Sequence, residues 1–411
     1  MIVSPASVFG SIRANASKSH LQRALVIAML SDGKSLLLNC DESADVIAVK
    51  NAIIALGAKV EGHETLLIEP SFPISDDTLK INVGESGLAL RMLAPVVSLF
   101  NNPVLIGGEG SLLNRPLQPL LDVLSEAGIS FETDSGKLPL KISGSAKNNH
   151  LKIDASFSSQ MLTGLLISAP LLQYDTVIHV MDVVSKPYIE MTLDIINDFG
   201  VCIEHENFER YFISGNQHYI GREYEIEGDW SGASNFLVAA AISGEITVTG
   251  LKSESKQADR NIMNVLKAFG AVVHCGQDSV TVRKNKSLLF IVDATDCPDL
   301  FPPLAVLAAA ARGTSVINGI QRLVHKESNR LESIMEMINA LGGKVQISDA
   351  GLIIHGNGKL KGGTVNSHND HRIVMAAAIA SCISENPVQI IGAEAVRKSY
   401  PDFFERFLGL C

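Results

Sequence analysis

The chain has 411 residues, of which 46% are hydrophobic and 19% charged, and its formal net charge is −10. This length exceeds what one compact core accommodates, so we expect at least two domains. The negative charge argues against a nucleic-acid-binding protein that relies on a basic face, but it leaves room for a local basic pocket.

The sequence predicts neither a secretory nor a membrane protein. The amino-terminal segment MIVSPASVFGSIRANASK has no long apolar stretch and no cleavage-like site. The apolar helical run 300–311 is only about a dozen residues long and contains two prolines, too short to span a bilayer. The six cysteines form no C-x-x-C pair and predict buried free thiols. We therefore expect a cytoplasmic protein without membrane partners.

The first predicted helix begins near Ser19, within NASKSHLQRAL, and raises an electrostatic question. Lys18 and Arg23 lie near its amino end, where the helix dipole already carries about half a positive charge. Ser19 and Arg23 are four residues apart and share a helical face. For one helix alone, two solvated surface charges are the simpler interpretation, but a bound anion would make both cations favourable.

A helix-like run that ends in glycine recurs at intervals of about 70 residues, each time before an extended apolar stretch. Glycine is expected just past a helix end because it adopts the left-handed conformation that closes the last turn. The six glycines are Gly57, Gly128, Gly200, Gly270, Gly342 and Gly409.

A second series of apolar helices is in phase with the first. These helices are predicted to begin near Ser19, Ser86, Ser158, Ser231, Asp299 and Asn369. Each opening offers Ser, Asp or Asn as a helix cap. Six units of strand, helix, strand, helix and strands predict a mixed α/β fold, divided into two groups of three. If helices of this series point the same way, their amino ends meet in one anion-binding cleft.

Cations recur near these openings or in neighbouring loops. They are Arg91, Arg115, Lys186, Lys326, Arg330, Arg372 and Lys398. In an acidic chain, this concentration predicts a substrate with several negative groups.

Ten motifs in chain order resemble those of the EPSP synthase (3-phosphoshikimate 1-carboxyvinyltransferase) family. They are SKSHLQRAL, GESGLALR, NRPLQPLLD, SSQMLTGLL, VSKPYIEMTL, EGDWSGASNFL, PDLFPPLAVLAA, HKESNRL, NDHRIVMAAA and RKSYPDFF. The resemblance implies two similar domains of three βαβαββ repeats each, 1–16 plus 227–411 and 17–226, with the active site in the inter-domain cleft. It also implies closure of the domains on binding and a monomeric enzyme.

The resemblance further implies an activity in the shikimate pathway. The family transfers the enolpyruvyl group of phosphoenolpyruvate to the 5-hydroxyl of shikimate 3-phosphate and releases phosphate, with no metal or organic cofactor. The residues matching shikimate 3-phosphate ligands are Lys18, Ser19, Arg23, Ser158, Ser159, Gln160, Ser185, Tyr188, Asp299 and Lys326. The residues matching phosphoenolpyruvate ligands are Lys18, Gly87, Arg91, Arg115, Gln160, Arg330, Arg372 and Lys398.

Three residues match the family's catalytic positions. Asp299 resembles the aspartate at the 5-hydroxyl, Glu327 the glutamate that exchanges protons at the methylene, and Lys18 a second proton carrier. From the residues alone, a simple helix cap is the better interpretation both for Asp299 and for the serines of SSQ. The pattern from His368 to His371 is also compatible with a metal site, but no further cluster has ligand spacing.

Glu85 and Leu88 depart from the family pattern, which has Asn and Thr at these places. A carboxylate repels a bound phosphate unless it turns away or pairs with a cation. We therefore expect weaker phosphoenolpyruvate binding or an altered response to inhibitors that mimic it.

Two other functions compete with enolpyruvyl transfer to shikimate 3-phosphate. The related transferase acting on UDP-N-acetylglucosamine carries a cysteine in its mobile loop, and the corresponding GGEGSLLNRP has none. A non-catalytic anion-binding scaffold is the other alternative, and the intact set of Lys18, Asp299 and Glu327 speaks against it.

Overall fold

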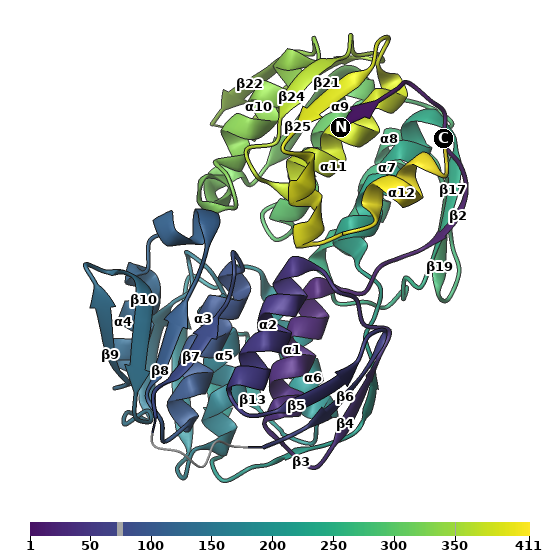
Figure 1. The fold of residues 1–411 in the computed structure, drawn as a ribbon. Helices are drawn as coiled ribbons and strands as arrows, with labels where there is room; N and C mark the ends of the chain where they lie inside the picture. Colours follow the sequence, from purple (N-terminus) through teal and green to yellow (C-terminus); the bar gives the residue numbers. More distant parts are fainter. Residues whose placement is uncertain (72–76, 350) are drawn as a thin grey trace. The chain divides into compact units, whose positions relative to one another are not determined.

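A computed structural model describes residues 1–71, 77–349 and 351–411 of the chain. The chain forms two compact units, and Figure 1 colours them along the sequence. Unit 1 consists of Met1–Ser17 and Glu227–Cys411, and unit 2 of Lys18–Ile226. The chain therefore starts in unit 1, builds the whole of unit 2, and then returns to complete unit 1.

The described residues of unit 2 form three four-stranded sheets with one topology, in the orders β16-β4-β6-β5, β7-β8-β10-β9 and β11-β12-β14-β13. In each sheet the first pair of strands is parallel and the other pairs are antiparallel. Two short strands, β3 (Ser31–Asp32) and β15 (Tyr219–Ile220), pair separately. The bounds of the sheet strands are β4 (Ser35–Leu38), β5 (Lys59–Gly62), β6 (Thr65–Glu69), β7 (Leu79–Asn82), β8 (Val104–Gly107), β9 (Ser130–Asp134), β10 (Lys137–Ser143), β11 (His150–Asp154), β12 (Thr176–Met181), β13 (Glu204–Glu206), β14 (Arg210–Ile213) and β16 (Glu223–Glu225).

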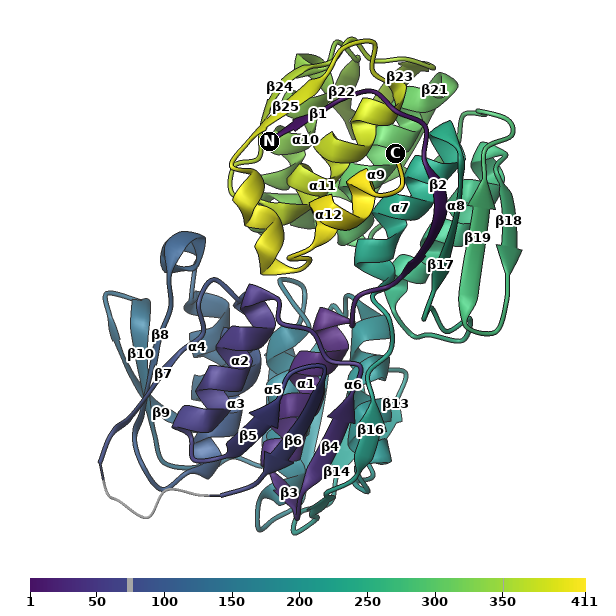
Figure 2. The same cartoon turned by 45° about the vertical axis from the view of Figure 1, so that its right-hand side comes forward.

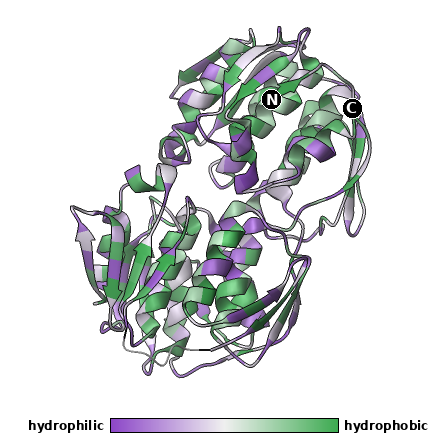
Figure 3. Cartoon of the chain, viewed as in Figure 1, coloured by the Kyte–Doolittle hydropathy of each residue, from purple (hydrophilic) through white to green (hydrophobic). Residues whose placement is uncertain are grey.

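The helices of unit 2 are of two kinds. Buried almost throughout are α1 (Lys18–Met29), α3 (Gly87–Val96) and α5 (Gln160–Ser168). Exposed on one face are α2 (Ala44–Ala55), α4 (Gln118–Glu126) and α6 (Lys186–Asp198). A helix that is apolar all round belongs in a core, and a helix with one apolar stripe covers it. Figure 3 colours the chain by hydropathy and shows hydrophobic residues in the helices of both units.

The described residues of unit 1 repeat this plan in two four-stranded sheets, β18-β19-β17-β2 and β20-β21-β23-β22, and form a third sheet of three strands, β1-β25-β24. Figure 2 shows the first of these, in which β2 comes from the amino terminus and lies beside β17. The strands are β1 (Ile2–Val3), β2 (Phe9–Arg13), β17 (Glu245–Thr249), β18 (Val272–Cys275), β19 (Ser279–Arg283), β20 (Ile291–Asp293), β21 (Arg312–Asn318), β22 (Val345–Ser348), β23 (Gly351–Asn357), β24 (Gly363–Asn366) and β25 (Val388–Ile391). The buried helices are α7 (Trp230–Ser243), α9 (Phe301–Ala310) and α11 (His371–Ala380), and the half-exposed helices are α8 (Ile262–Phe269), α10 (Arg330–Ala340) and α12 (Phe403–Leu408).

The predicted fold class is confirmed. A complete repeat runs strand, buried helix, strand, half-exposed helix and two strands, as in β7, α3, β8, α4, β9 and β10. Two repeats borrow their first strand from a distant segment: β16 joins the repeat of α1, and β2 joins the repeat of α7. These borrowed strands stand where the chain passes from one unit to the other.

The glycines at the helix ends follow the prediction in five cases of the series. Gly270, for example, has φ +94 and closes α8 with bonds to Leu266 and Lys267 carbonyls. Gly409 differs, because its φ is −68 and it continues the right-handed turn of α12. The helix starts also shift slightly: α5 begins at Gln160, α11 at His371, and α9 at Phe301 after a 3-10 turn, η5 (Pro298–Leu300).

All six cysteines are free, but the prediction that they are buried is only partly right. Cys40 and Cys297 are buried, whereas Cys202 in the segment before β13, Cys275 at the end of β18 and Cys411 at the end of the chain are exposed. In the parts of the chain that the structure describes, no helix is both long and apolar enough to cross a bilayer.

Candidate functional site

The centre of the site in unit 1 is Arg330, the first residue of α10, whose side chain is completely buried. Its Nη1 donates to Oδ1 of Asp299 at 2.6 Å, and its Nη2 donates to Oε2 of Glu327. Its Nε donates to Oδ2 of Asp370 at 3.0 Å. One guanidinium thus joins both predicted catalytic carboxylates to a third, buried carboxylate. These carboxylates raise the pKa of Arg330 above its ordinary value, although burial alone would lower it.

Asp370 fixes this arrangement from the amino end of α11. Its Oδ1 accepts the backbone N–H of Arg372 at 2.9 Å and so caps the helix. Its Oδ2 accepts the hydroxyl of Ser328 at 3.1 Å as well as Arg330. Because the same carboxylate caps α11 and holds Arg330, the starts of α10 and α11 keep one geometry.

Asp299 is not a helix cap. It lies in η5, and neither η5 nor α9 has a side-chain cap hydrogen bond. Its second oxygen, Oδ2, is 3.5 Å from Nη2 of Arg372. Burial alone would raise its pKa, but Arg372, Arg330 and Lys326 outweigh burial and hold the pKa below its ordinary value. The carboxylate is therefore ionised in the free protein at neutral pH.

Two lysines of unit 1 were also predicted as ligands. Burial among cations lowers the pKa of Lys326 to about 8, although Asp299 partly opposes the shift. Lys398, at the end of η8 (Ala393–Lys398), is buried and donates to the carbonyl of Asn369 at 2.8 Å. That carbonyl directly precedes Asp370, so Lys398 lies beside the start of α11.

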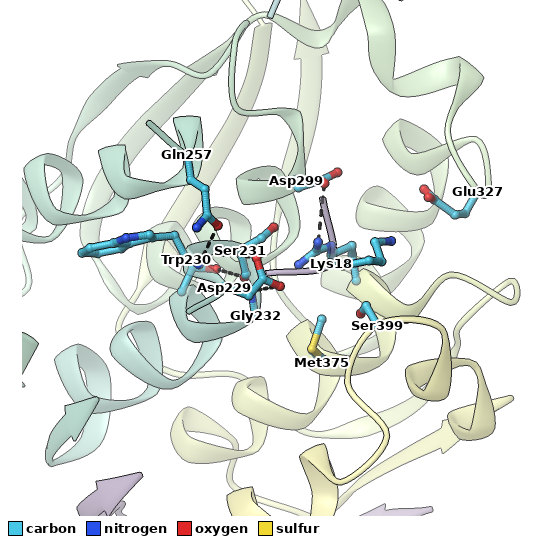
Figure 4. Close-up of polar contacts among 12 residues, drawn as sticks. Lys18, Asp229, Trp230, Ser231, Gly232, Gln257, Asp299, Glu327, Met375 and Ser399 are labelled. Carbon is cyan, nitrogen blue, oxygen red and sulfur yellow. Dashed lines mark hydrogen bonds and ion pairs between the residues drawn. The ribbon is translucent and has the colours of Figure 1, made fainter. Parts of the chain in front are cut away.

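A further set of buried polar groups lies at the start of α7. Asp229 caps the helix by accepting the N–H groups of Ser231 and Gly232, each at 3.2 Å, and Figure 4 shows both bonds. Gln257 accepts the N–H of Trp230 at 3.0 Å in the same view. Nearby, burial and then the charge of Asp299 raise the pKa of Asp259 to about 6.

In unit 2, Lys18 and Arg23 on α1 have partners within the protein. Nζ of Lys18 is 2.9 Å from Oδ2 of Asp45, an acidic residue of the first turn of α2. Arg23 donates through Nε to the hydroxyl of Thr192 at 2.8 Å and through Nη1 to the carbonyl of Ser19 at 2.6 Å. The ion pair with Asp45 partly explains why a cation is tolerated at the amino end of α1, because it offsets the unfavourable interaction of Lys18 with the helix dipole.

Two more cations lie at the start of α3: Arg91 within the helix and Arg115, which follows η2 (Gly110–Asn114). Arg91 donates to Oε1 of Gln160 at 2.8 Å, and its guanidinium lies 5.3 Å from the ring centroid of Phe157. A Cβ on Gly87 would lie 2.8 Å from Nη1 of Arg91 and 2.9 Å from Nη1 of Arg115. Only glycine lets both guanidiniums lie directly against the first residue of this helix.

The remaining residues predicted on the sugar side surround α5 and α6. The hydroxyl of Ser158 accepts the N–H of Gln160 at 3.2 Å, whereas Ser159 makes no side-chain cap bond. Both are buried. Ser185 precedes α6 with a left-handed φ of +54, and its carbonyl accepts the N–H of Tyr188 at 3.0 Å.

Some buried donor atoms of these arginines have no partner among the described residues. They are Nε of Arg115 and both Nε and Nη1 of Arg372. An unsatisfied buried N–H is costly, and in a folded protein it calls for an explanation. Arg372 is only 3% exposed, so these donors have little access to bulk solvent, and an anion is a group that can accept from them.

Sequence reasoning missed the residues that hold the cations in place: Asp45, Phe157, Thr192 and Asp370. None has a local signal that distinguishes it from a helix cap or a core residue. The alternative metal reading of the His368–His371 segment finds no support in the geometry. His368 bonds Glu336 at 2.6 Å, and among the described residues no three His, Cys, Asp or Glu side chains form a group that could hold a metal ion.

Comparison with known proteins agrees with the motif order. The family model of EPSP synthase (3-phosphoshikimate 1-carboxyvinyltransferase) matches residues 2–407. A 3-phosphoshikimate 1-carboxyvinyltransferase of Clostridium kluyveri is 38% identical over 99% of this chain and 96% of its own length. One of Methanocorpusculum labreanum is 37% identical over 98% of this chain and 96% of its own length.

Solved structures support the fold. The EPSP synthase of Acinetobacter baumannii superposes with a TM-score of 0.83 over 100% of this chain and 97% of that one, at 23% identity. The match of the family model over nearly the whole length, with relatives well above 30% identity, settles the assignment. The chain belongs to the EPSP synthase family.

Proposed function

We propose that this protein transfers the enolpyruvyl group of phosphoenolpyruvate to the 5-hydroxyl of shikimate 3-phosphate, with release of phosphate, as a step of the shikimate pathway. The observation that carries the proposal is the match of the family model over residues 2–407. The geometry supports it, because the residues that match the family's ligand positions are buried cations and helix starts. Such groups suit two substrates that together carry two phosphates and two carboxylates.

The proposed ligands divide by unit. Most of those assigned to shikimate 3-phosphate lie in unit 2, around Arg23 and the starts of α5 and α6. Those assigned to phosphoenolpyruvate lie in both units, with Arg91 and Arg115 in unit 2 and Arg330, Arg372 and Lys398 in unit 1. The proposal therefore requires both units to act on the same pair of substrates.

The chemistry needs a base for the sugar hydroxyl and an acid for the methylene carbon of phosphoenolpyruvate. Asp299 is proposed as the base. In the free protein its cations make it a weak base, but an anion bound to Arg372 would offset part of that positive charge and raise its basicity. Glu327, on the other side of Arg330, is proposed to exchange the proton at the methylene, with Lys18 as a second proton carrier. The same cations stabilise the phosphate as it leaves.

The test is release of phosphate from phosphoenolpyruvate with each acceptor supplied separately. We expect release with shikimate 3-phosphate and none with UDP-N-acetylglucosamine or without an acceptor. Release with UDP-N-acetylglucosamine would favour the related transferase, and no release with any acceptor would favour a non-catalytic anion-binding protein.

Closure of the two units around the substrates follows from the division of ligands between them. Small-angle scattering of the free protein and of the protein with shikimate 3-phosphate should show a smaller radius of gyration for the complex. Equal radii would contradict closure.

We also propose a monomer that works in the cytoplasm. Both substrates carry several negative charges and do not cross a bilayer unaided, so the enzyme belongs in the compartment that makes them. Sedimentation velocity should give a single species near 44.0 kDa. A species of twice that mass would contradict the monomer.

A further inference from the structure

The loop between β7 and α3 carries a carboxylate, Glu85, close to the two arginines at the start of α3. Because the proposed function places phosphoenolpyruvate against these arginines, a negative charge here needs an explanation. The contacts of Glu85 supply one: its carboxylate turns to the N–H and hydroxyl groups of Ser111, so we no longer expect it to weaken phosphoenolpyruvate binding by repulsion.

Glu85 binds the turn η2 (Gly110–Asn114), which directly precedes Arg115. Its Oε2 accepts the backbone N–H of Ser111 at 2.9 Å and the hydroxyl of Ser111 at 2.8 Å. The same hydroxyl accepts Nη2 of Arg115 at 3.3 Å. A hydroxyl can donate once and accept at the same time, so Ser111 links the carboxylate to the guanidinium.

The backbone of η2 is shaped to admit the carboxylate. Gly110 has φ +52, and a Cβ there would lie 2.5 Å from Cδ of Glu85 and 2.7 Å from each of its oxygens. On the other side of the link, Nη1 of Arg115 lies against Gly87, at the amino end of α3. The hydrogen bonds from Glu85 through Ser111 therefore lead to the guanidinium of Arg115, which lies against the start of α3.

We propose that Glu85 is a positioning residue that orders η2 and holds the guanidinium of Arg115 in place for phosphoenolpyruvate. Charge-assisted hydrogen bonds to a carboxylate are stronger than neutral ones, so they restrict a loop and a long side chain effectively. A guanidinium that is already placed binds its anion with less loss of conformational freedom. The inference rests on the proposed function, which assigns Arg115 to phosphoenolpyruvate.

The kinetic test compares variants along the link in steady-state assays with both substrates. Glu85→Ala should raise KM for phosphoenolpyruvate about tenfold, while kcat and KM for shikimate 3-phosphate change less than twofold. Ser111→Ala should raise the same KM by a smaller factor, and the double variant should be no worse than Glu85→Ala alone. Glu85→Gln keeps an acceptor oxygen and should stay within threefold of the wild type.

Glu109→Ala is the matched control. Glu109 lies one residue before η2, and its Oε1 accepts from Asn82 at 2.7 Å rather than from the link. Its removal deletes the same charge near the same loop and should leave KM for phosphoenolpyruvate unchanged. An unchanged or lower KM in Glu85→Ala, or additive effects of the two single variants, would overturn the proposal.

Amide hydrogen exchange tests the positioning without any turnover. The amide of Ser111 should exchange at least tenfold faster in Glu85→Ala than in the wild type and Glu109→Ala. If the wild type fails to release phosphate but this exchange difference is found, the proposed function fails and the structural role of Glu85 stands. Equal exchange in all three proteins would overturn the role itself.

Discussion

Arg23 in unit 2 and Arg330 in unit 1 are both fully buried, yet their surroundings are opposite. Arg330 bonds three carboxylates, which raise its pKa above the ordinary value against the effect of burial. Arg23 bonds a hydroxyl and a backbone carbonyl, and burial lowers its pKa to about 10, with Tyr188 opposing the shift only in part. One cation is matched by charge within the protein, and the other by neutral dipoles.

This difference suits the two arginines to different functions, proton transfer and anion binding. A cation bound to several carboxylates holds acid and base groups at fixed places, which suits proton transfer. A buried cation with neutral partners has an uncompensated desolvation cost that a bound anion relieves. We therefore expect unit 1 to supply the two carboxylates proposed for proton transfer, Asp299 and Glu327, and the substrate to complete the site around Arg23.

The largest expected effect comes from Asp299. Asp299→Asn preserves the shape of the side chain but removes the proposed base, so kcat should fall at least about 10³-fold while the protein stays folded. Phosphate release at saturating substrates measures the fall, and circular dichroism checks the fold.

Asp293→Asn serves as the control for this substitution. Asp293 is an exposed carboxylate in the same repeat, and it accepts from the hydroxyl of Thr295 at 2.6 Å. Its replacement should leave kcat within a factor of two. Turnover near the wild-type rate in Asp299→Asn would show that the base lies elsewhere.

Arg330→Met should cause the next largest effect, this time on stability. It leaves Asp370, a carboxylate with no exposed surface, without its cation, and breaking a buried pair in this way costs about 3–5 kcal/mol. The single tryptophan, Trp230, is buried in unit 1, so its fluorescence follows the unfolding of this unit in urea. A loss below about 1 kcal/mol would mean that the three carboxylates do not depend on Arg330.

The sequence was sufficient to predict the repeats, whereas the candidate ligands that it named remain predictions. The repeats could be predicted because each contains an apolar helix with a polar cap and a second helix that is followed by glycine. Both features are local in the sequence. The cations were visible because they recur at equivalent places in an acidic chain.

The partners of those cations could not be predicted, because they depend on contacts between distant segments. Asp45 meets Lys18 only because α2 packs beside α1, and Thr192 meets Arg23 from the middle of α6. Nothing in the sequence around Ser111 indicates a role, because that role depends on its hydrogen bond to Glu85 in another loop. A single sequence contains such residues without marking which pairs come into contact.

A pH series sharpens this contrast, because Lys326 is a half-buried cation whose pKa, like that of Arg23, is lowered by desolvation, in this case to about 8. In the free enzyme it should lose its charge above pH 8, so kcat/KM for shikimate 3-phosphate should fall by up to tenfold per pH unit. Lys326→Arg remains charged and should keep kcat/KM nearly level to about pH 9.5. An equal decline in both proteins would assign the titration to another group.

The lowered pKa of Lys326 also makes the free energy of unfolding depend on pH. The folded protein releases this proton near pH 8, whereas the unfolded chain keeps it to about 10.5. Between these values the unfolded state binds more protons, so the contribution of Lys326 to the free energy of unfolding rises with pH. Lys326→Met should remove that rise.

The smallest expected change in stability is also the sharpest contrast with Arg330. Arg23→Met removes a buried charge whose partners are neutral, and Thr192 keeps its bond to the carbonyl of Tyr188 at 2.9 Å. The free energy of unfolding of the free protein should therefore change by less than about 1 kcal/mol, in either direction. KM for shikimate 3-phosphate should nevertheless rise about 100-fold, because the substrate loses a buried cation.

Unfolding in urea measures the change in stability. Circular dichroism follows the unfolding of both units, and Trp230 fluorescence identifies the share of the transition that belongs to unit 1. A loss of stability as large as that of Arg330→Met would mean that a negative group of the free protein already neutralises Arg23. The proposed difference in function between the two arginines would then be wrong.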